Sequence, residues 1–547
     1  MVLEVRGIRD IFQDGIKSGW QVVNASQLTA NQTIEADVLI IGTGAGGGTA
    51  AETLSAAGLH VVLIEEGPLR TSNDFKMRED HAYRDLYQES AARATKDASM
   101  VILQGRSVGG STTVNWTSSF RTPAFTLAQW SKTHGVKGVS EAEMAPWFEQ
   151  REKRLNILPW AEAPNANNDV IRQGCEKLGW TWHVIPRNVN GCWNLGYCGM
   201  GCPTNAKQSM LITTIPAALS NKASLYYRAR ADKLIIEGDK VTGVTCMAMK
   251  EDAMNYTGIT LTVKAKHTIL SGGGINNPGL LLRSQAPDPY KVIGKRTFLH
   301  PVNAVFAHYN RRIEPYAGAP QSIYSDYFQW KDGATGPMGY KIEAIPMHPG
   351  LTASLLGNYG QEHADDMRAI GSMNGLISLL RDGFIDDSPG GTVSLRDDGV
   401  PTVDYPMTDA LRDGLRRAFL SMAEIQFAAG ATKVRPSQLE ASYYNSWNEC
   451  SAAIKGFKID KFRTQLGSAH VMGGCAMGED PQASVVNSLG DFHQLRNLSV
   501  MDGSLFPTSI GANPQLSIYG LVAKLSAGLV TRLAPNATVM PAKVAAS

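Results

Sequence analysis

ADVLIIGTGAGGGTAAETLSAAGLHVVLIEEG, at residues 36–67, predicts a strand, a glycine-rich turn, a helix and a second strand in immediate succession. Residues 38–41 form an uninterrupted apolar run, which is typical of a buried parallel strand. The alanine-rich stretch from about 46 to 57 predicts the helix, and residues 60–64 predict the second strand. This order indicates a βαβ unit at the start of an α/β domain.

Gly42, Gly44 and Gly47 within this unit have the spacing GxGxxG. The first glycine permits a tight turn, the second lets a phosphate approach the backbone, and the third lets the helix pack close to the strand. The free N–H groups at the start of the helix favour a pyrophosphate. Glu65 follows Gly47 by 18 residues, where a carboxylate would bind ribose hydroxyls. Together these features predict a dinucleotide site.

The bulk properties of the chain are those of a globular protein. A length of 547 residues predicts two domains, and a net charge of +2 without a Lys/Arg-rich block argues against nucleic acid as a partner. Seven cysteines argue for a reducing compartment. The N-terminal residues lack the apolar region of a signal peptide, so we expect a cytoplasmic protein, with peripheral membrane association left open. Residues 516–533 are apolar but contain Lys524 and Arg532, which predicts a buried helix and no transmembrane segment.

Further glycine-rich segments recur along the chain and suggest that the nucleotide domain is assembled from separated pieces. A glycine turn at 238–239 predicts a β-meander, and residues 267–282 predict another strand, glycine turn and helix. The expected organisation is an N-terminal extension (1–35), a nucleotide-binding domain (36–300, with 124–205 a partly helical cover), a substrate domain (301–464), a second piece of the nucleotide-binding domain (465–535) and a tail (536–547).

Four further motifs follow the βαβ unit: GRSVGGSTTVNW (105–116), SGGGINNPGLLLRS (271–284), HVMGGCAMG (470–478) and NLSVMDGSLFPTSIGANPQLSIYGLVAK (497–524). In this order they resemble the glucose–methanol–choline (GMC) oxidoreductases, a family of FAD-dependent enzymes that oxidise alcohols. The third motif matches the family's His-x-x-Gly-x-Cys-x-Met-Gly block. Asn277 departs from the family, which usually has Thr or Ser at that position. TTVNW followed by RTP at 121–123 is most similar to the long-chain alcohol oxidases.

The resemblance implies an α/β fold of GMC type: a Rossmann-like FAD-binding domain with an inserted α+β substrate domain built on an antiparallel sheet. Its motifs imply contacts with FAD along the chain. Val114 stands where some members carry a histidine bound covalently to the flavin, so we expect non-covalent FAD. The residues expected to bind FAD are Gly42, Gly44, Gly47, Glu65, Gly105, Arg106, Gly109, Gly110, Thr112, Asn115, Asp502, Gly503, Asn513 and Pro514.

Alcohol oxidation requires that the hydroxyl proton leave, that a hydride pass to the flavin, and that the developing alkoxide be stabilised. His470 matches the catalytic histidine of the family, and a histidine suits proton exchange because its pKa lies near working pH. The resemblance places Asn513 beside it. Asn513 can hydrogen-bond the substrate oxygen but cannot titrate, so His470 is expected to carry the acid–base role. Glu343, in an apolar strand, matches a glutamate that serves as base in some steroid-oxidising relatives, although a paired glutamate is the simpler interpretation.

Cys192, Cys198 and Cys202 gather in CWNLGYCGMGCP. Three thiolates can hold an iron–sulfur cluster, and some cytochrome-linked relatives have one in this region. Those relatives add an adjacent cysteine, and here Trp193 takes that place. We therefore expect no metal, and a redox-inert role in packing the loop or a disulfide as the use of these cysteines.

The sequence favours an FAD-dependent alcohol oxidase or dehydrogenase that acts on a hydrophobic, long-chain primary alcohol, with O2 or an electron carrier as acceptor. A sterol, sugar or polyol is the alternative substrate. A non-catalytic flavin-binding protein and an NAD(P)-dependent oxidoreductase are alternatives of other classes. His470 and Asn513 argue against the first of these, and the downstream flavin motifs argue against the second.

Overall fold

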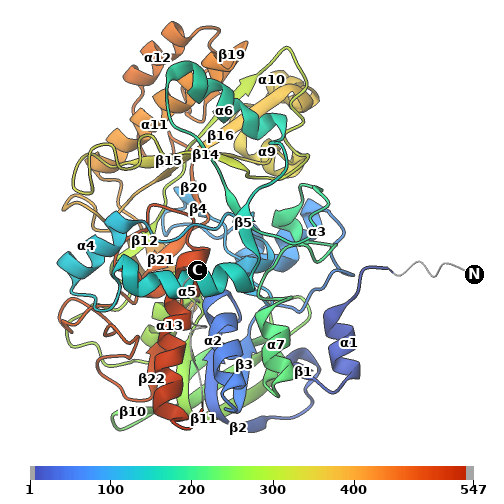
Figure 1. The fold of residues 1–547 in the computed structure, drawn as a ribbon, viewed down its shortest axis with the longest axis vertical. Helices are drawn as coiled ribbons and strands as arrows, with labels where there is room; N and C mark the ends of the chain where they lie inside the picture. Colours follow the sequence, from blue (N-terminus) through green and yellow to red (C-terminus); the bar gives the residue numbers. More distant parts are fainter. Residues whose placement is uncertain (1–6, 538–547) are drawn as a thin grey trace, which may run out of the picture.

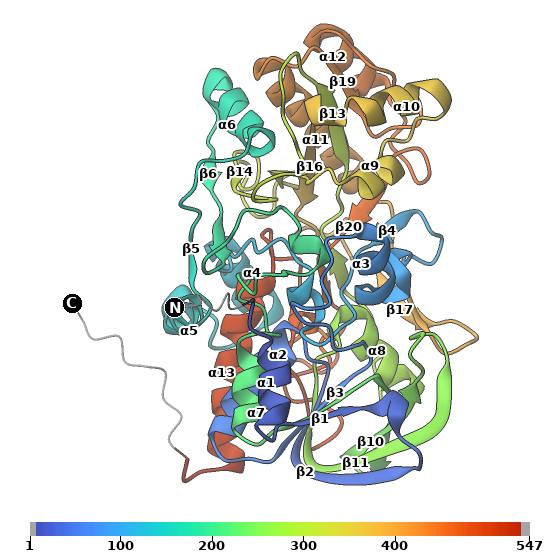
Figure 2. The same cartoon turned by 90° about the vertical axis from the view of Figure 1, so that its right-hand side faces the viewer.

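A computed structural model describes residues 7–537 of the chain, so the predicted tail at 536–547 lies almost wholly outside the described residues. Two sheets form its two halves (Figures 1 and 2). In the lower half, helices cover an eight-stranded sheet; the upper half is built on a six-stranded sheet. The α/β fold class expected from the sequence is confirmed.

The lower sheet has a parallel centre and an antiparallel edge. Its parallel pairs join β1, β8, β3, β2 and β11 in that spatial order, β22 also pairs with β11, and β11–β10–β9 is the predicted antiparallel meander. Residues 38–41 of β2 are all buried, as their apolar run predicted, and so are all five residues of β3. The strands are β1 (Gln21–Asn24), β2 (Gln32–Ile41), β3 (Val61–Glu65), β8 (Ser224–Tyr227), β9 (Ala229–Glu237), β10 (Lys240–Met249), β11 (Tyr256–Leu270) and β22 (Leu498–Val500).

The upper sheet is antiparallel in every pair, in the order β19-β13-β16-β15-β14-β6. Its edge strand β6 comes from the segment that was expected to cover the nucleotide domain. The predicted domain boundaries remain a prediction. The strands are β6 (His183–Val184), β13 (Ala304–His308), β14 (Ile323–Ser325), β15 (Tyr340–Ala344), β16 (Met373–Leu380) and β19 (Lys433–Pro436).

In the described part of the chain, four two-stranded ladders lie outside these sheets. The antiparallel pair β12–β21 bears on the predicted catalytic residue. His300 directly follows β12, and His470 directly precedes β21. The ladders are β12 (Thr297–Leu299) with β21 (Val471–Gly473), β17 (Thr392–Leu395) with β18 (Pro401–Asp404), β20 (Leu466–Ser468) with β4 (Met100–Ile102), and β5 (Ile157–Pro159) with β7 (Pro186–Asn188).

Helix α2 is the expected helix of the βαβ unit, and it packs against α7 and α13. Among residues 7–537, α13 alone is long and apolar enough to cross a membrane, and 61% of that stretch is buried inside the protein. The helices are α1 (Ile11–Lys17), α2 (Ala45–Ala56), α3 (Glu79–Leu86), α4 (Ala124–His134), α5 (Glu141–Arg154), α6 (Ala166–Leu178), α7 (Thr214–Ser220), α8 (Gly273–Arg283), α9 (Pro349–Leu355), α10 (Gly360–Arg368), α11 (Asp409–Ala428), α12 (Trp447–Gly456) and α13 (Gln515–Leu533).

Candidate active site

A continuous cavity of about 640 Å³ runs from the end of the lower sheet towards the upper sheet. The predicted glycine turn and flavin motifs line one end of it, and His470, Asn513 and Glu343 line the other. Trp116, Val302 and other apolar side chains complete the second end. The cavity thus joins the predicted nucleotide site to the predicted catalytic residues.

The glycine turn forms a cradle that larger residues would fill. Gly42 has a φ of +104°, and a Cβ on Gly47 would lie 1.9 Å from the carbonyl oxygen of Gly42. A Cβ on Gly44, in contrast, would meet only the Cα of Gly110, at 3.8 Å. Gly44 caps α2 without a side-chain hydrogen bond, so the first N–H groups of the helix remain available to a ligand. This geometry fits a bound pyrophosphate.

Glu65 lies in the cavity wall, but its carboxylate is already engaged. It accepts hydrogen bonds from the backbone N–H of Thr43 at 3.1 Å and of Gly67 at 2.9 Å. Its neighbour Glu66 also lines the cavity and pairs with Arg106, at 2.9 Å from Nε. Burial raises the pKa of Glu66, but the charges of Arg106 and of two further arginines outweigh burial and lower it. The sequence analysis did not single out Glu66, although a second carboxylate directly after Glu65 indicated another residue that could reach the nucleotide site.

The second flavin motif folds back over the glycine turn. Gly109 and Gly110 have φ values of +90° and +54°, and a Cβ on Gly110 would lie 2.7 Å from the Cα of Gly44. Thr112 accepts a hydrogen bond from the N–H of Met210 at 3.0 Å. The motif therefore needs glycine where the two turns meet.

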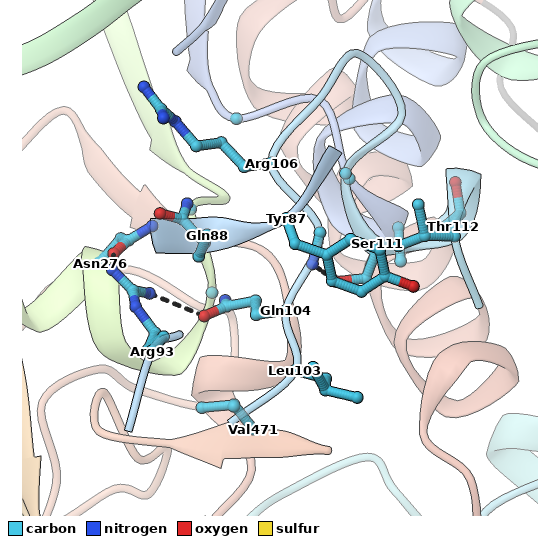
Figure 3. Close-up of a pocket in the computed structure, with 18 of the residues that line it drawn as sticks. Tyr87, Gln88, Arg93, Leu103, Gln104, Arg106, Ser111, Thr112, Asn276 and Val471 are labelled. Atoms are coloured by element: carbon cyan, nitrogen blue, oxygen red, sulfur yellow. Dashed lines mark hydrogen bonds between the residues drawn. The ribbon is translucent and has the colours of Figure 1, made fainter. Parts of the chain in front are cut away.

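The remaining residues of this motif lie around the same end of the cavity. Gly105 and Asn115 both line it, and Asn115 donates to Gln515 at 2.7 Å. Figure 3 shows Arg93 between Gln104 and Asn276, to which it donates at 2.8 and 3.2 Å, with Arg106 and Gln88 nearby. The buried Arg93 and the partly buried Arg106 thus both lie at the nucleotide end.

Asp502 ties the closing motif to the start of α8. Its carboxylate accepts from the N–H of Gly273 at 2.6 Å and from Asn277 at 2.9 Å. Gly503 and Pro514 also line the cavity, and Pro514 caps α13. Asn277, which departs from the usual family residue, is therefore part of the packing that positions this segment.

Asn513 contacts a buried ion pair that sequence reasoning only partly anticipated. Lys341 and Glu343 lie 2.9 Å apart on β15, with 3% and 0% of their side chains exposed. Lys341 donates to Oδ1 of Asn513 at 2.6 Å, and Nδ2 of Asn513 donates to Glu343 at 3.2 Å. The ring of Phe120 lies 3.4 Å from the Lys341 ammonium. Glu343 is thus paired, as the simpler interpretation held, yet it also faces the cavity. Lys341 gave no sequence signal.

His470 lies opposite His300, which the sequence did not single out. The register of β12 and β21 pairs Leu299 with Val471, so the next position brings the two histidines together. Their Nδ1 atoms lie 3.0 Å apart. Burial, and then the charge of Lys341, lowers the pKa of His470 to about 3. Burial and the neighbouring His470 lower the pKa of His300 well below its ordinary value. Both rings are therefore neutral near pH 7.

The three loop cysteines lie near one another and near two cations. Burial raises the pKa of Cys198, with a smaller increase from Cys202 and Cys192 and an opposing effect of Arg187. Lys207 donates to the carbonyl oxygens of Thr113, Asn115 and Cys198 at 2.6, 3.0 and 2.7 Å. Lys207 therefore ties the cysteine loop to the second flavin motif. Within residues 7–537 no group of three His, Cys, Asp or Glu side chains has the arrangement of a metal site.

Known proteins share both the sequence pattern and the fold. A long-chain-alcohol oxidase of Arabidopsis thaliana is 27% identical over 511 residues, which cover 89% of this chain and 67% of the relative. A 6'''-hydroxyparomomycin C oxidase of Streptomyces lividus is 24% identical over 546 residues, which cover 91% of this chain and 92% of the relative.

Solved structures agree with this similarity. A formate oxidase variant of Aspergillus oryzae superimposes with a TM-score of 0.69 at 15% identity, over 92% of this chain and all of the other. A pyridoxine 4-oxidase gives a TM-score of 0.66 at 18% identity, over 90% and 98% of the two chains. The sequence models of GMC oxidoreductases match residues 83–302 and 387–521. Since these matches together span more than half of the chain, the protein belongs to the GMC oxidoreductase family and is an FAD-dependent oxidoreductase.

Proposed function

We propose that the protein oxidises the CH–OH group of a hydrophobic, long-chain primary alcohol to the aldehyde. The observation that carries the proposal is the cavity itself, which joins the glycine cradle to His470 and Asn513. The similarity to plant long-chain-alcohol oxidases supports the substrate class, and so do the apolar residues Trp116, Val302, Ile377 and Leu379 at the catalytic end.

FAD bound in the cradle would accept the hydride from the alcohol carbon. The residues that would hold it are those of the two turns that line the cavity, together with Glu65 and the segment 502–503; the turn residues are Gly42, Gly44, Gly105 and Gly110. The chain's own residues would manage the oxygen and its proton. His470 is the first candidate for exchanging a proton with the substrate oxygen, and Asn513 donates a hydrogen bond to that oxygen through Nδ2.

Lys341 fixes the orientation of Asn513, because an ammonium group can only donate and so directs Oδ1 towards itself. The amide nitrogen is then left for Glu343 and the substrate oxygen. Glu343, which accepts a hydrogen bond from Asn513, is the second candidate for accepting the hydroxyl proton. We propose O2 or an electron carrier as the electron acceptor. We also propose that the protein is cytoplasmic, with peripheral association with a membrane as a variant of this proposal.

A sugar, sterol or polyol is the alternative substrate. The 6'''-hydroxyparomomycin C oxidase, which by its name acts on a polar compound, supports this alternative. A non-catalytic flavin-binding role would require that no alcohol reduce the flavin.

One experiment tests these possibilities together. The purified yellow protein is mixed anaerobically with a panel of alcohols, from short to long primary alcohols and including a sterol and a polyol. We expect the flavin absorption to bleach fastest with long-chain primary alcohols. Rapid recovery on readmission of air would identify an oxidase, and slow recovery a dehydrogenase. Bleaching by the polyol alone would contradict the substrate proposal, and no bleaching at all would contradict the enzymatic one.

A further inference from the structure

The two facing histidines share a hydrogen bond whose direction follows from a third group. The backbone N–H of Gly511 lies 3.2 Å from Nε2 of His300. A backbone N–H can only donate, so Nε2 of His300 must accept and carries no proton. A neutral imidazole has one N–H, and that of His300 is therefore on Nδ1.

The proton on Nδ1 of His300 then determines the state of His470. The contact between the two Nδ1 atoms at 3.0 Å needs one donor and one acceptor. Because His300 donates, Nδ1 of His470 accepts, and the single proton of a neutral His470 is on Nε2. His470 lines the cavity, so this N–H is the polar group that the ring has left for a ligand.

Other protonation states are disfavoured by the same contacts. If His470 carried its proton on Nδ1, His300 would have to carry its own proton on Nε2. That proton would then face the backbone N–H of Gly511. An imidazolium form of either ring would place two donors in one contact, close to the ammonium of Lys341 and among buried groups. The loop at Gly511 is closely packed, since a Cβ on this residue would lie 2.8 Å from Nε2 of Gln329.

We infer that His300 is a positioning residue that holds His470 in the neutral form with its proton on Nε2, so that His470 presents a hydrogen-bond donor to the substrate oxygen. The inference deepens the proposed function and rests on it for the role of the donor. A ring in this form cannot accept the hydroxyl proton at Nε2. Of the two candidates named above for that step, this leaves Glu343, whose carboxylate would take the proton as the alcohol O–H bond breaks.

The form of His470 can be measured without catalysis. Protein labelled with ¹⁵N in histidine is studied by NMR through the ring C–H protons, and the His470 signals are identified by their loss in His470→Gln. We expect a neutral ring with Nε2 protonated, in the flavin-bound protein at neutral pH. A ring protonated on Nδ1, or on both nitrogens, would overturn the inference. This readout is independent of the substrate, so it stands even if no alcohol reduces the flavin.

Variants of His300 test the positioning role. His300→Asn keeps an N–H donor near the position of Nδ1, whereas His300→Leu removes it. We expect His300→Leu to slow anaerobic flavin reduction by about tenfold, the effect of one ordinary hydrogen bond, and His300→Asn to recover most of the rate. His308→Gln is the matched control, since His308 is a buried histidine of β13 that hydrogen-bonds Asp366 away from the cavity. Equal rates for His300→Leu and the wild type would contradict the role, and so would a loss in His308→Gln as large as in His300→Leu.

Discussion

At the scale of single residues, His470 and Asn513 belong to two separate sets of polar contacts that line the same cavity. His470 depends on His300 for its orientation, and Asn513 depends on Lys341 and Glu343. These contacts separate the expected effects of replacing each residue. A missing imidazole removes a group that can exchange or share a proton, whereas a missing amide removes only a hydrogen bond.

We therefore predict that His470→Ala retains FAD but loses most of its reductive half-reaction. Losing one hydrogen-bond donor to the developing oxyanion costs about 10²–10³ in rate. Asn513→Ala is the comparison and should lose less. Anaerobic stopped-flow measurement of flavin reduction gives both rates. If His470→Ala stays within about threefold of the wild type, far short of the effect of losing such a donor, His470 has a structural role and does not stabilise the substrate oxygen.

The lowered pKa of His470 predicts how the reaction responds to pH. Its pKa falls from an ordinary 6.5 to about 3 on folding, so the ring stays neutral through mildly acidic pH. We expect no step in the rate of flavin reduction near pH 6.5 that is due to His470. The charged and titratable groups around it are His300, Lys341 and Glu343. A step near 6.5 that disappears in His470→Gln would contradict the prediction.

The same shift has a consequence for stability. The unfolded chain takes up a proton on His470 as the pH falls through 6.5, whereas the folded protein does so only near 3. The free energy of unfolding therefore keeps the full contribution of neutral His470 above pH 6.5. It progressively loses this contribution as the pH falls from 6.5 to about 3. His470→Gln should narrow the difference in thermal stability between neutral and acidic pH.

Val114 predicts how FAD is held. The side chain at this position lines the cavity and has no atom able to form a bond to the flavin ring. Acid precipitation should therefore release all yellow colour into the supernatant. Flavin that remains on the washed pellet would show a covalent bond formed by a different residue.

At the scale of elements, the sequence predicted local units well and the pairings between them poorly. The glycine turn, α2 and the meander were evident because each depends on neighbouring residues. The contact of His300 with His470 was not evident, because it arises from the register between β12 and β21, whose residues lie far apart in the chain. Lys341 was missed for a similar reason: a lysine in an apolar strand has meaning only once Glu343 and Asn513 are placed around it.

The cysteine loop gives a prediction at this scale. Lys207 attaches the loop to the second flavin motif, and Trp193 takes the place of an adjacent cysteine. We expect metal analysis of anaerobically purified protein to find no iron. About three iron atoms per chain, with absorption beyond the flavin bands, would contradict this and indicate a cluster on Cys192, Cys198 and Cys202.

At the scale of the whole molecule, the cavity connects the two sheets. Its lining includes Gly44 beside β2, Glu343 of β15 and Leu379 of β16. A ligand that fills it contacts both halves of the protein, so FAD binding and unfolding must be linked. A ligand present at a hundred times its dissociation constant stabilises the folded state by about 2.7 kcal/mol.

Gly44 and Gly47 provide a matched pair to test this linkage. Gly44→Ala places a methyl group in open space at the start of α2, with only a contact of 3.8 Å to Gly110, so the apo protein should unfold at the temperature of wild-type apo protein. The methyl group would lie where the pyrophosphate approaches, so the increase in unfolding temperature on adding FAD should be largely lost. Gly47→Ala brings a Cβ to 1.9 Å from the oxygen of Gly42 and should destabilise the apo protein itself. Thermal unfolding of the three proteins with and without FAD distinguishes these outcomes. A full FAD-dependent increase in Gly44→Ala would show that the pyrophosphate binds away from this helix end.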